Sequence, residues 1–214
     1  MLLKTHEDLQ SDSPAVTKLP VMEAFYTIQG EGAHQGRAAY FIRLGGCDVG
    51  CHWCDVKESW QADAHPQRLV REIVTEAARH PARLAVITGG EPLMHDLTEL
   101  CEALHQHGFK INIETSGAHP LSGKLDWICL SPKKFKAPLP EFYQRAHELK
   151  VIVYNGSDFA WAEQFAERVS PNCRLFLQPE WSVSDKILPQ IIDYVKENPR
   201  WSISLQVHKF MQIP

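Results

Sequence analysis

Three closely spaced cysteines carry the clearest chemistry in this sequence. Cys47, Cys51 and Cys54 have the spacing Cys-x3-Cys-x2-Cys and come shortly after the largely apolar run 40–44. Thiolates so close in sequence can converge on one metal site, but a closed tetrahedral site needs four ligands. An iron–sulfur cluster held by three cysteines keeps one iron open for a ligand that is not protein. The spacing therefore predicts a [4Fe-4S] cluster that binds and reduces a small molecule.

A structural zinc knuckle is the alternative for the same cysteines. It would need a fourth ligand such as His52, which lies between two of them, and the sequence has no second Cys-x2-Cys pair. The other three cysteines, Cys101, Cys129 and Cys173, lie in apolar surroundings, where packing in the core is the favoured role.

The composition is that of an ordinary globular protein. The 214 residues are 44% hydrophobic and 22% charged, and the net charge of −4 gives no basic footprint for nucleic acid. No apolar run approaches the roughly 20 residues of a membrane span, and the first residues lack the apolar region of a signal peptide. We therefore expect a cytoplasmic protein with no direct nucleic-acid or membrane partner. Residues 1–20 are expected to form a flexible tail, and residues 21–214 a single core domain.

Short apolar runs alternate with helical patterns along this core. Several runs are continuously apolar, such as residues 84–87, which is typical of parallel strands buried on both faces. The alternation predicts an α/β fold with a mainly parallel sheet. The expected strands are Ala39–Leu44, Leu84–Thr88, Lys110–Glu114, Trp127–Ser131, Leu149–Tyr154, Arg174–Gln178 and Trp201–His208. The expected helices are Pro66–His80, Asp96–His107, Asp158–Val169 and Ser184–Glu197.

Two details argue against a complete eightfold barrel. The connection from residue 115 to residue 126 contains Gly117, Pro120 and Gly123, so we expect no full helix there. The run 201–208 alternates between apolar and polar residues, which indicates an edge strand with one face on the core. The sequence therefore predicts an open partial (β/α) barrel.

Polar residues and glycines follow five of the expected strands. Because the carboxyl ends of parallel strands share one face, these segments should meet at one rim, where barrel enzymes place their chemistry. The segments are the cysteine loop 45–56, Thr88–Pro92, Glu114–Gly117, Ser131–Lys134 and Gln178–Glu180.

These motifs carry a resemblance to a known family. The cysteine triplet with Trp53, followed by Gly89-Gly90-Glu91-Pro92, resembles the radical S-adenosylmethionine (SAM) superfamily. Within it, residues 25–32 and 208–214 are similar to the 7-carboxy-7-deazaguanine synthase family of the queuosine pathway, and the resemblance runs from about residue 21 onward. It implies a [4Fe-4S] cluster and SAM as cofactors. The implied reaction converts 6-carboxy-5,6,7,8-tetrahydropterin to 7-carboxy-7-deazaguanine with loss of ammonia.

The resemblance also implies which residues hold the cofactors. Cys47, Cys51 and Cys54 would ligate the cluster. At Gly90 the absence of a side chain would let the amino group of SAM approach the backbone closely, although a tight turn alone would also explain Gly89-Gly90. Ser131 and Lys133 offer a hydroxyl and an ammonium donor, which would suit the carboxylate of SAM, although a capped loop end would also explain these two residues. The implied cofactor-binding residues are Trp53, Cys54, Asp55, Gly90, Ser131, Pro132, Lys133 and Gln178.

A second set of residues is implied for the pterin. Arg43 is a charged residue within an apolar strand, so it needs an anionic partner. That partner would be a substrate carboxylate or the side chain of Glu31 or Glu114. Residues 29–32 would contact the pterin edge or form a flexible turn, and Pro214 would offer a terminal carboxylate or be a frayed end. The implied substrate-binding residues are Ile28, Gln29, Gly30, Glu31, Arg43, Thr88 and Pro214.

One position departs from the family pattern. Relatives often follow the last cysteine with Asp and then Thr or Ser, whose hydroxyl helps to hold Mg²⁺, whereas this chain has Asp55 and Val56. Because valine cannot ligate magnesium, we expect weak or absent magnesium dependence. The resemblance further implies a flavodoxin-type electron donor and a homodimer. A glycyl-radical activase is the alternative enzyme, and it would need neither Arg43 nor the 29–32 loop.

Overall fold

The structure is a computed structural model that describes residues 17–214. Within this range, one sheet of nine strands has the order β3-β1-β2-β4-β5-β6-β7-β8-β9. Neighbours from β2 to β9 are parallel, whereas β1 is antiparallel to β2 and to β3. The predicted mainly parallel sheet is confirmed. The strands are β1 (Lys18–Ile28), β2 (Ala38–Leu44), β3 (Gln67–Leu69), β4 (Leu84–Gly89), β5 (Lys110–Thr115), β6 (Trp127–Leu130), β7 (Glu148–Val153), β8 (Arg174–Pro179) and β9 (Trp201–Ile203).

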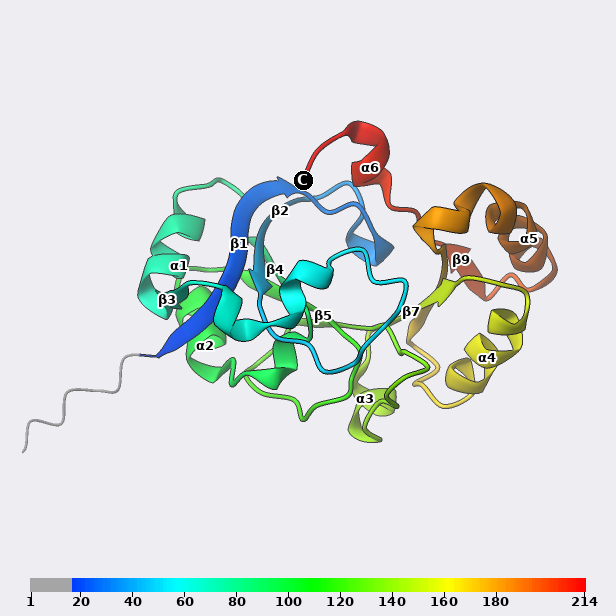
Figure 1. Ribbon diagram of the computed structural model, residues 1–214, viewed down its shortest axis with the longest axis horizontal. Helices are drawn as coiled ribbons and strands as arrows, with labels where there is room; N and C mark the ends of the chain where they lie inside the picture. The colour runs from blue at the N-terminus through cyan, green and yellow to red at the C-terminus, as the bar shows by residue number, and fades with distance from the viewer. Residues whose placement is uncertain (1–16) are drawn as a thin grey trace, which may run out of the picture.

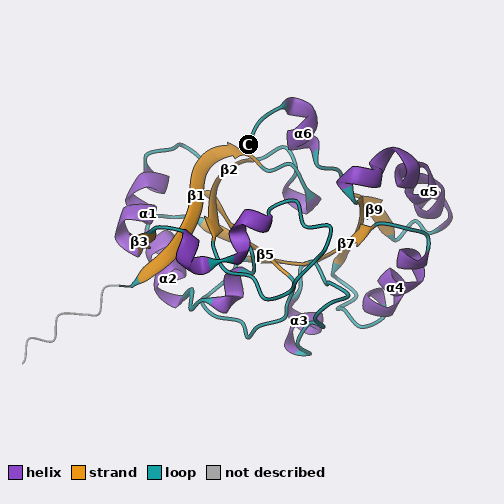
Figure 2. Ribbon diagram, viewed as in Figure 1, coloured by secondary structure: helices purple, strands orange, loops and turns teal. Residues whose placement is uncertain are grey.

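The sheet curves into an arc that does not close, and helices cover its outer face (Figure 1, Figure 2). The predicted open partial barrel is therefore confirmed. The cysteine loop crosses the opening of the arc, and α6 lies beside the ends of β1 and β2 (Figure 1). The helices are α1 (Val70–Ala78), α2 (Thr98–Gln106), α3 (Glu141–Arg145), α4 (Ser157–Ala166), α5 (Ser184–Glu197) and α6 (Val207–Met211).

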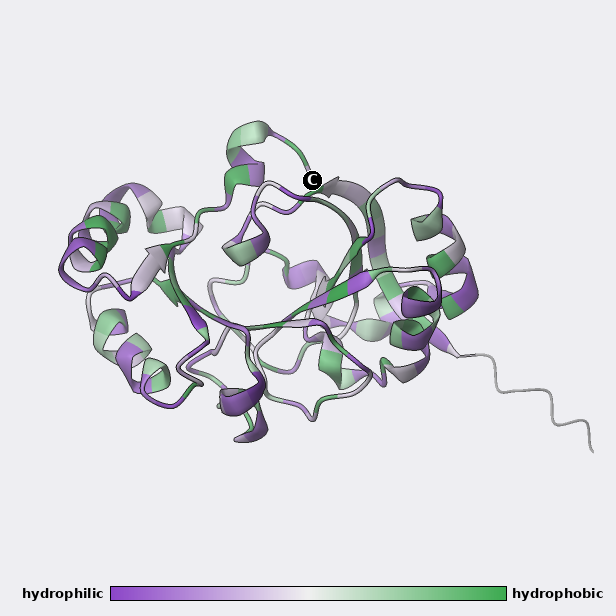
Figure 3. Cartoon of the chain, turned by 180° about the vertical axis from the view of Figure 1, so that it is seen from behind, coloured by the Kyte–Doolittle hydropathy of each residue, from purple (hydrophilic) through white to green (hydrophobic). Residues whose placement is uncertain are grey.

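The main hydrophobic core lies between the outer face of the arc and these helices. Strand residues such as Ile87 and Ile111 pack there with Ile73 of α1 and Leu104 of α2. Apolar segments accordingly run along the arc where it meets the helices (Figure 3). The inner face is different, because it combines a small apolar cluster around Val86 with buried polar residues such as Asn112, Lys150 and Gln178. Burial on both faces explains why β4 has a continuously apolar sequence.

The two strands at the start of the sheet, β1 and β3, were not among the expected ones. Residues 18–20 pair with β3, and Leu19 is 3% exposed, so these residues belong to the core rather than to a tail. The rest of the predicted tail, residues 1–16, lies outside the described residues. Because Gln67–Leu69 pair with β1 as a strand, the first helix begins at Val70 and not at Pro66.

The last expected strand is shorter than predicted. β9 lies at the edge as expected but ends at Ile203. Ser204 makes the last backbone hydrogen bond to β8, from its N–H to the Leu177 carbonyl, and its hydroxyl donates to Gln178 Oε1 at 2.6 Å. The chain then turns across the cavity, where the Val207 N–H donates to the Gly30 carbonyl at 3.1 Å. The contacts of Ser204 and Val207 with distant residues therefore decide where the strand ends, although the alternating pattern continues to residue 208.

The other helices agree more closely with the sequence. α5 has the expected bounds and contains Pro189, whereas α2 and α4 are shorter than expected. As predicted, the connection from β5 to β6 has no helix among its described residues. No helix within residues 17–214 is long and apolar enough to span a membrane.

Candidate active site

A cavity of about 270 Å³ opens at the carboxyl ends of the parallel strands. All five polar segments contribute to its lining, so the prediction that they share one rim is confirmed. Pro132 is buried but is not part of the lining. The other predicted site residues all line the cavity: Ile28, Gln29, Gly30, Glu31, Arg43, Cys47, Cys51, Trp53, Cys54, Asp55, Thr88, Gly90, Ser131, Lys133, Gln178 and Pro214.

Backbone hydrogen bonds fix the cysteine loop at the edge of the cavity. Gly46 N–H donates to the Ser59 carbonyl at 2.6 Å, and Cys47 N–H donates to the Trp60 carbonyl at 3.1 Å. Cys51 is 8% exposed, and this burial raises the pKa of its thiol to about 11, against the opposing effect of Lys133. A cluster that binds here would therefore displace thiol protons.

Gly90 joins this loop to β4. Its N–H donates to the Leu44 carbonyl at 3.0 Å, and the next N–H, of Glu91, donates to the Gly46 carbonyl at 2.8 Å. A Cβ atom added at Gly90 would lie 2.3 Å from the Gly46 oxygen and 2.7 Å from Cys47 Cβ. Gly90 is thus required for the turn itself, and it also leaves backbone open beside the cysteines. The two interpretations of this glycine are compatible.

The sulfur positions argue against a zinc knuckle. Ligand atoms around one zinc lie within about 4 Å of one another, because Zn–S bonds are about 2.3 Å long. Within residues 17–214, only Glu114, Cys129 and Glu148 form a His/Cys/Asp/Glu group of three with ligand atoms inside 4.8 Å. The exposed His52 ring packs against Phe135 and Tyr154 and does not line the cavity. The wider cysteine spacing fits a larger metal cluster, for which three thiols and one open position suffice.

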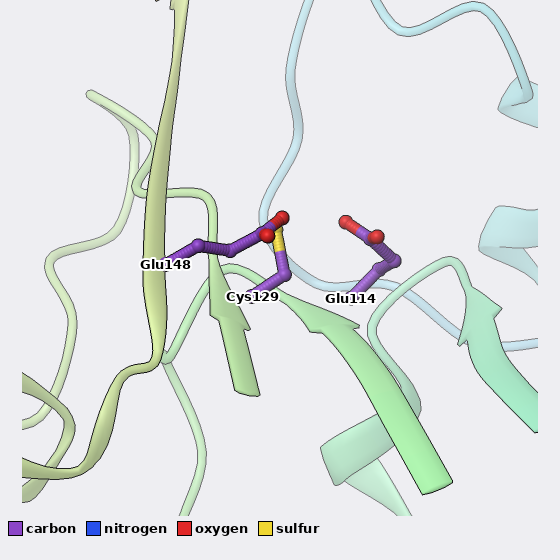
Figure 4. A group of neighbouring side chains, drawn as sticks. All are labelled: Glu114, Cys129 and Glu148. Atoms are coloured by element: carbon purple, nitrogen blue, oxygen red, sulfur yellow. The ribbon is translucent and has the colours of Figure 1, made fainter. Parts of the chain in front are cut away.

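The group of Glu114, Cys129 and Glu148 lies on neighbouring strands of the inner face (Figure 4). Glu148 accepts hydrogen bonds from Ala33 N and from Trp127 Nε1, and burial together with Glu114 raises its pKa. Burial also raises the pKa of Cys129 well above its ordinary value. The Glu148 carboxylate already accepts these two hydrogen bonds and Glu114 Oε2 pairs with Lys150 Nζ, so this group belongs to a buried polar network.

Lys150 is the centre of that network. Its Nζ lies 2.5 Å from Glu31 Oε2 and 2.8 Å from Glu114 Oε2, and its side chain is 5% exposed. Burial lowers the pKa of Lys150, but the surrounding acidic groups, among them Glu114 and Glu31, outweigh this and raise it well above its ordinary value. Burial likewise raises the pKa of Glu31, yet Lys150 and Gln206 bring it down to about 2. One buried cation thus holds two ionised carboxylates in the cavity wall.

Three further polar contacts involve predicted residues. Lys133 Nζ donates to the hydroxyl and to the carbonyl of Ser131, at 2.6 Å each. Gln178 is 2% exposed and accepts from the Ser204 hydroxyl. Arg43 Nε donates to Glu23 Oε1 at 2.6 Å on the neighbouring strand, so its salt-bridge partner is neither Glu31 nor Glu114. The Arg43 side chain is 20% exposed and still lines the cavity.

The cavity also contains residues that the sequence analysis did not place there. Lys150 carried the same signal as Arg43, a charge within an apolar strand, and could have been found in that way. Glu114 was expected at the rim within the segment Glu114–Gly117 and as a possible partner for Arg43, but not as the partner of Lys150. Gln206 and His208 were assigned to a strand, and nothing in their spacing indicated that the chain would turn back over the cavity.

Comparisons with known proteins extend beyond the cysteine motif. Residues 41–154 match the family model of the radical SAM superfamily. The chain is 57% identical over 196 residues to the 7-carboxy-7-deazaguanine synthase of Flavobacterium psychrophilum, covering 92% of this chain and 93% of that protein. It is 48% identical over 194 residues to the protein of that name from Synechocystis sp., covering 91% and 93%. The crystal structure of QueE from Escherichia coli aligns with a TM-score of 0.79 at 32% identity, covering 88% of this chain and 93% of that one.

Proposed function

The chain belongs to the radical SAM superfamily and, within it, to the 7-carboxy-7-deazaguanine synthases, and from this premise we propose how its cavity performs the reaction. Enzymes of this family contract the ring of 6-carboxy-5,6,7,8-tetrahydropterin to 7-carboxy-7-deazaguanine, with loss of ammonia. The observation that carries the proposal is the single cavity that the three cysteines share with Glu31, Glu114 and the buried Lys150.

Cofactor binding is assigned to one side of the cavity. Cys47, Cys51 and Cys54 hold the [4Fe-4S] cluster, and the backbone at Gly90 faces the amino group of SAM. The Ser131 hydroxyl and the Lys133 ammonium, paired with each other in this structure, would donate to the carboxylate and ribose of SAM, and Gln178 and Trp53 line the same cavity. When bound, the cluster and SAM supply a radical that removes a hydrogen atom from the substrate.

Substrate binding is assigned to the opposite side. Gln29 accepts the Glu31 N–H at 3.2 Å and donates to Glu114 at 3.3 Å, so this loop has a fixed shape and is not a flexible turn. Its backbone, with Ile28, Gly30 and Thr88, contacts the pterin edge. Arg43 binds the substrate carboxylate, and Pro214 offers an oxygen to the guanidine-like edge. The protein's part is to orient the pterin and to exclude water.

An anaerobic assay tests the function. Reduced enzyme reconstituted with about four irons per chain is incubated with SAM and the carboxypterin. We expect 7-carboxy-7-deazaguanine and ammonia in equal amounts. Formation of a glycyl radical on an added protein, with no deazapurine product, would favour the activase. Colourless protein that contains zinc would contradict both enzymes.

Magnesium does not fit the residues next to Cys54. Val56 lines the cavity without a side-chain oxygen, and Asp55 Oδ2 is occupied by Lys209 Nζ at 3.2 Å and by Gln206 Nε2 at 3.4 Å. We therefore assign no step to this ion and expect wild-type turnover to be independent of it. Val56→Thr should introduce magnesium stimulation, and Val56→Ala is the control. Strong stimulation of the wild type would contradict this assignment.

Two partners complete the proposal, and both rest on the resemblance. A flavodoxin-type protein supplies the electron, and cross-linking to reduced flavodoxin, followed by peptide mapping, should identify residues near the cysteine loop. A second copy of the chain forms a homodimer, which sedimentation at several concentrations would detect. A chain that sediments as a monomer at every concentration would contradict the dimer.

A further inference from the structure

Residues 206–214, called here the strap, cross the opening of the cavity and touch both of its sides. Val207 N–H donates to the Gly30 carbonyl at 3.1 Å, and the Thr27 hydroxyl donates to the Pro214 oxygen at 3.3 Å. These contacts join the strap to the substrate side. Helix α6 lies within the strap, beside the ends of β1 and β2 (Figure 1).

Hydrophobic burial contributes little to holding the strap. None of the residues of α6 is buried, and Phe210 and Met211 are 67% and 43% exposed. Gln212 has a φ of 56°, a left-handed conformation that is unfavourable for a residue other than glycine. A segment with few buried apolar contacts lies at the low end of local stability, so its position depends on a few polar contacts.

Asp55, directly after Cys54, receives two of these contacts. Lys209 Nζ lies 3.2 Å from Asp55 Oδ2. Gln206 Nε2 donates to Glu31 Oε1 at 2.9 Å and reaches the same Asp55 oxygen at 3.4 Å. Within the described residues, the Asp55 side chain has no hydrogen-bond or ion-pair partner outside the strap. The strap therefore ties the cysteine loop to the substrate-side carboxylate.

The Lys209 ammonium contacts an aromatic ring as well as Asp55. It lies 4.6 Å from the centre of the Trp181 ring, and that ring packs edge-on against Phe210 at 5.7 Å. The ammonium is thus fixed between an aromatic face and a carboxylate, which reduces the entropy lost when the ion pair forms.

We propose that Lys209 and Gln206 are positioning residues that latch the strap to Asp55, so that the substrate site is complete only when the cysteine loop is in place. The proposal rests on the function proposed above. Because a coupling between two sites is reciprocal, assembly of the loop around its cluster should stabilise the closed strap, and a closed strap should stabilise the loop. Enzyme without the latch would cleave SAM before the substrate is held, and the radical would be wasted.

The first test does not depend on activity. Amide hydrogen exchange in residues 206–214 is compared between cluster-loaded and cluster-free protein. Wild type should show slower exchange in the loaded form, and Lys209→Met should remove most of that difference. Lys196→Met is the matched control, since Lys196 is 71% exposed on α5 and, among residues 17–214, pairs only with Asp193. Equal protection of the strap in loaded and cluster-free wild type would overturn the latch.

The second test measures coupling. Lys209→Met should raise KM for the carboxypterin about fivefold, as expected for loss of an ion pair worth up to about 1 kcal/mol. It should also raise the ratio of 5′-deoxyadenosine to deazaguanine product. Asp55→Asn should give the same changes, and the double variant should be no worse than either single one. A Lys209→Met enzyme with wild-type KM and ratio would overturn the latch, whereas a wild type that forms no product would overturn the proposed function instead.

Discussion

The two sides of the cavity are held together in different ways. The cofactor wall, residues 45–56, 89–91 and 131–133, is fixed mainly by backbone hydrogen bonds, such as the one from Gly90 N–H to the Leu44 carbonyl. The substrate wall, residues 28–31, Glu114, Lys150 and the strap, is fixed by side-chain ion pairs and amide contacts. A backbone-held wall tolerates change in its side chains without loss of the fold, whereas a wall built from buried charges does not.

The largest expected effect on activity is on the cofactor wall. Cys51→Ala should bring product formation below detection, because an iron of the cluster loses its ligand, and iron content should fall with it. The loop is held by backbone contacts, so unfolding by urea should change little. Cys173→Ala, which removes a buried thiol far from the cavity, is the control. Retained turnover in Cys51→Ala would contradict the assignment of the cluster ligands.

The largest expected effect on stability is on the substrate wall. Lys150→Met leaves the partly buried Glu31 and Glu114 without their cation, and breaking such a pair costs up to about 3–5 kcal/mol of unfolding free energy. Lys110→Met is the control, because Lys110 is 75% exposed and its ion pair with Asp126 is 3.5 Å long. Equal losses in the two variants, measured by urea denaturation, would mean that the charge network does not hold this wall.

This difference explains what could be predicted from the sequence. The cofactor wall is built from segments that follow strands. Its cysteines, Gly90 and Ser131 can be recognised from their residue types and local spacing. The substrate wall depends on partners far apart in the chain, such as Lys150 with Glu31 and Gln206 with Asp55. No local pattern encodes such contacts. For the same reason the strand at 201–208 was predicted too long, since the chain after Ile203 is held by Gln178 and Gly30, which no local pattern reveals.

Acid should weaken the substrate wall through Glu31. Its pKa of about 2 is below the ordinary value of 4.5, so its ionised form contributes stability above pH 4.5, and this is lost as pH falls toward 2. The shift corresponds to a contribution on the order of 3 kcal/mol. Glu31→Gln should therefore lower the unfolding free energy at pH 7 and flatten its dependence on pH between 5 and 3. Parallel acid profiles for wild type and variant would contradict the ion pair.

Shortening the strap should have a smaller effect, confined to substrate binding. Removal of Ile213 and Pro214 takes away the oxygen that Thr27 contacts and part of the cavity lining. We expect KM for the carboxypterin to rise about tenfold, equivalent to about 1.4 kcal/mol, while SAM cleavage without product continues. Thr27→Val, which removes only the hydrogen bond, should have a fraction of this effect. An unchanged KM would show that Pro214 has no part in recognition.

The smallest expected effect concerns Glu148, beneath the substrate wall. Burial and the nearby Glu114 raise its pKa, so its protonated form contributes stability that is present at low pH and is lost as pH rises through the pKa of the folded state. Glu148→Gln removes this loss, and its amide oxygen can still accept from Ala33 N and Trp127 Nε1. The variant should therefore gain stability over wild type as pH rises from 5 to 8, whereas exposed Glu197→Gln should not. If urea unfolding instead shows Glu148→Gln less stable than wild type by the same amount across that range, Glu148 is ionised in the folded protein, and the substrate wall contains a third carboxylate that depends on Lys150.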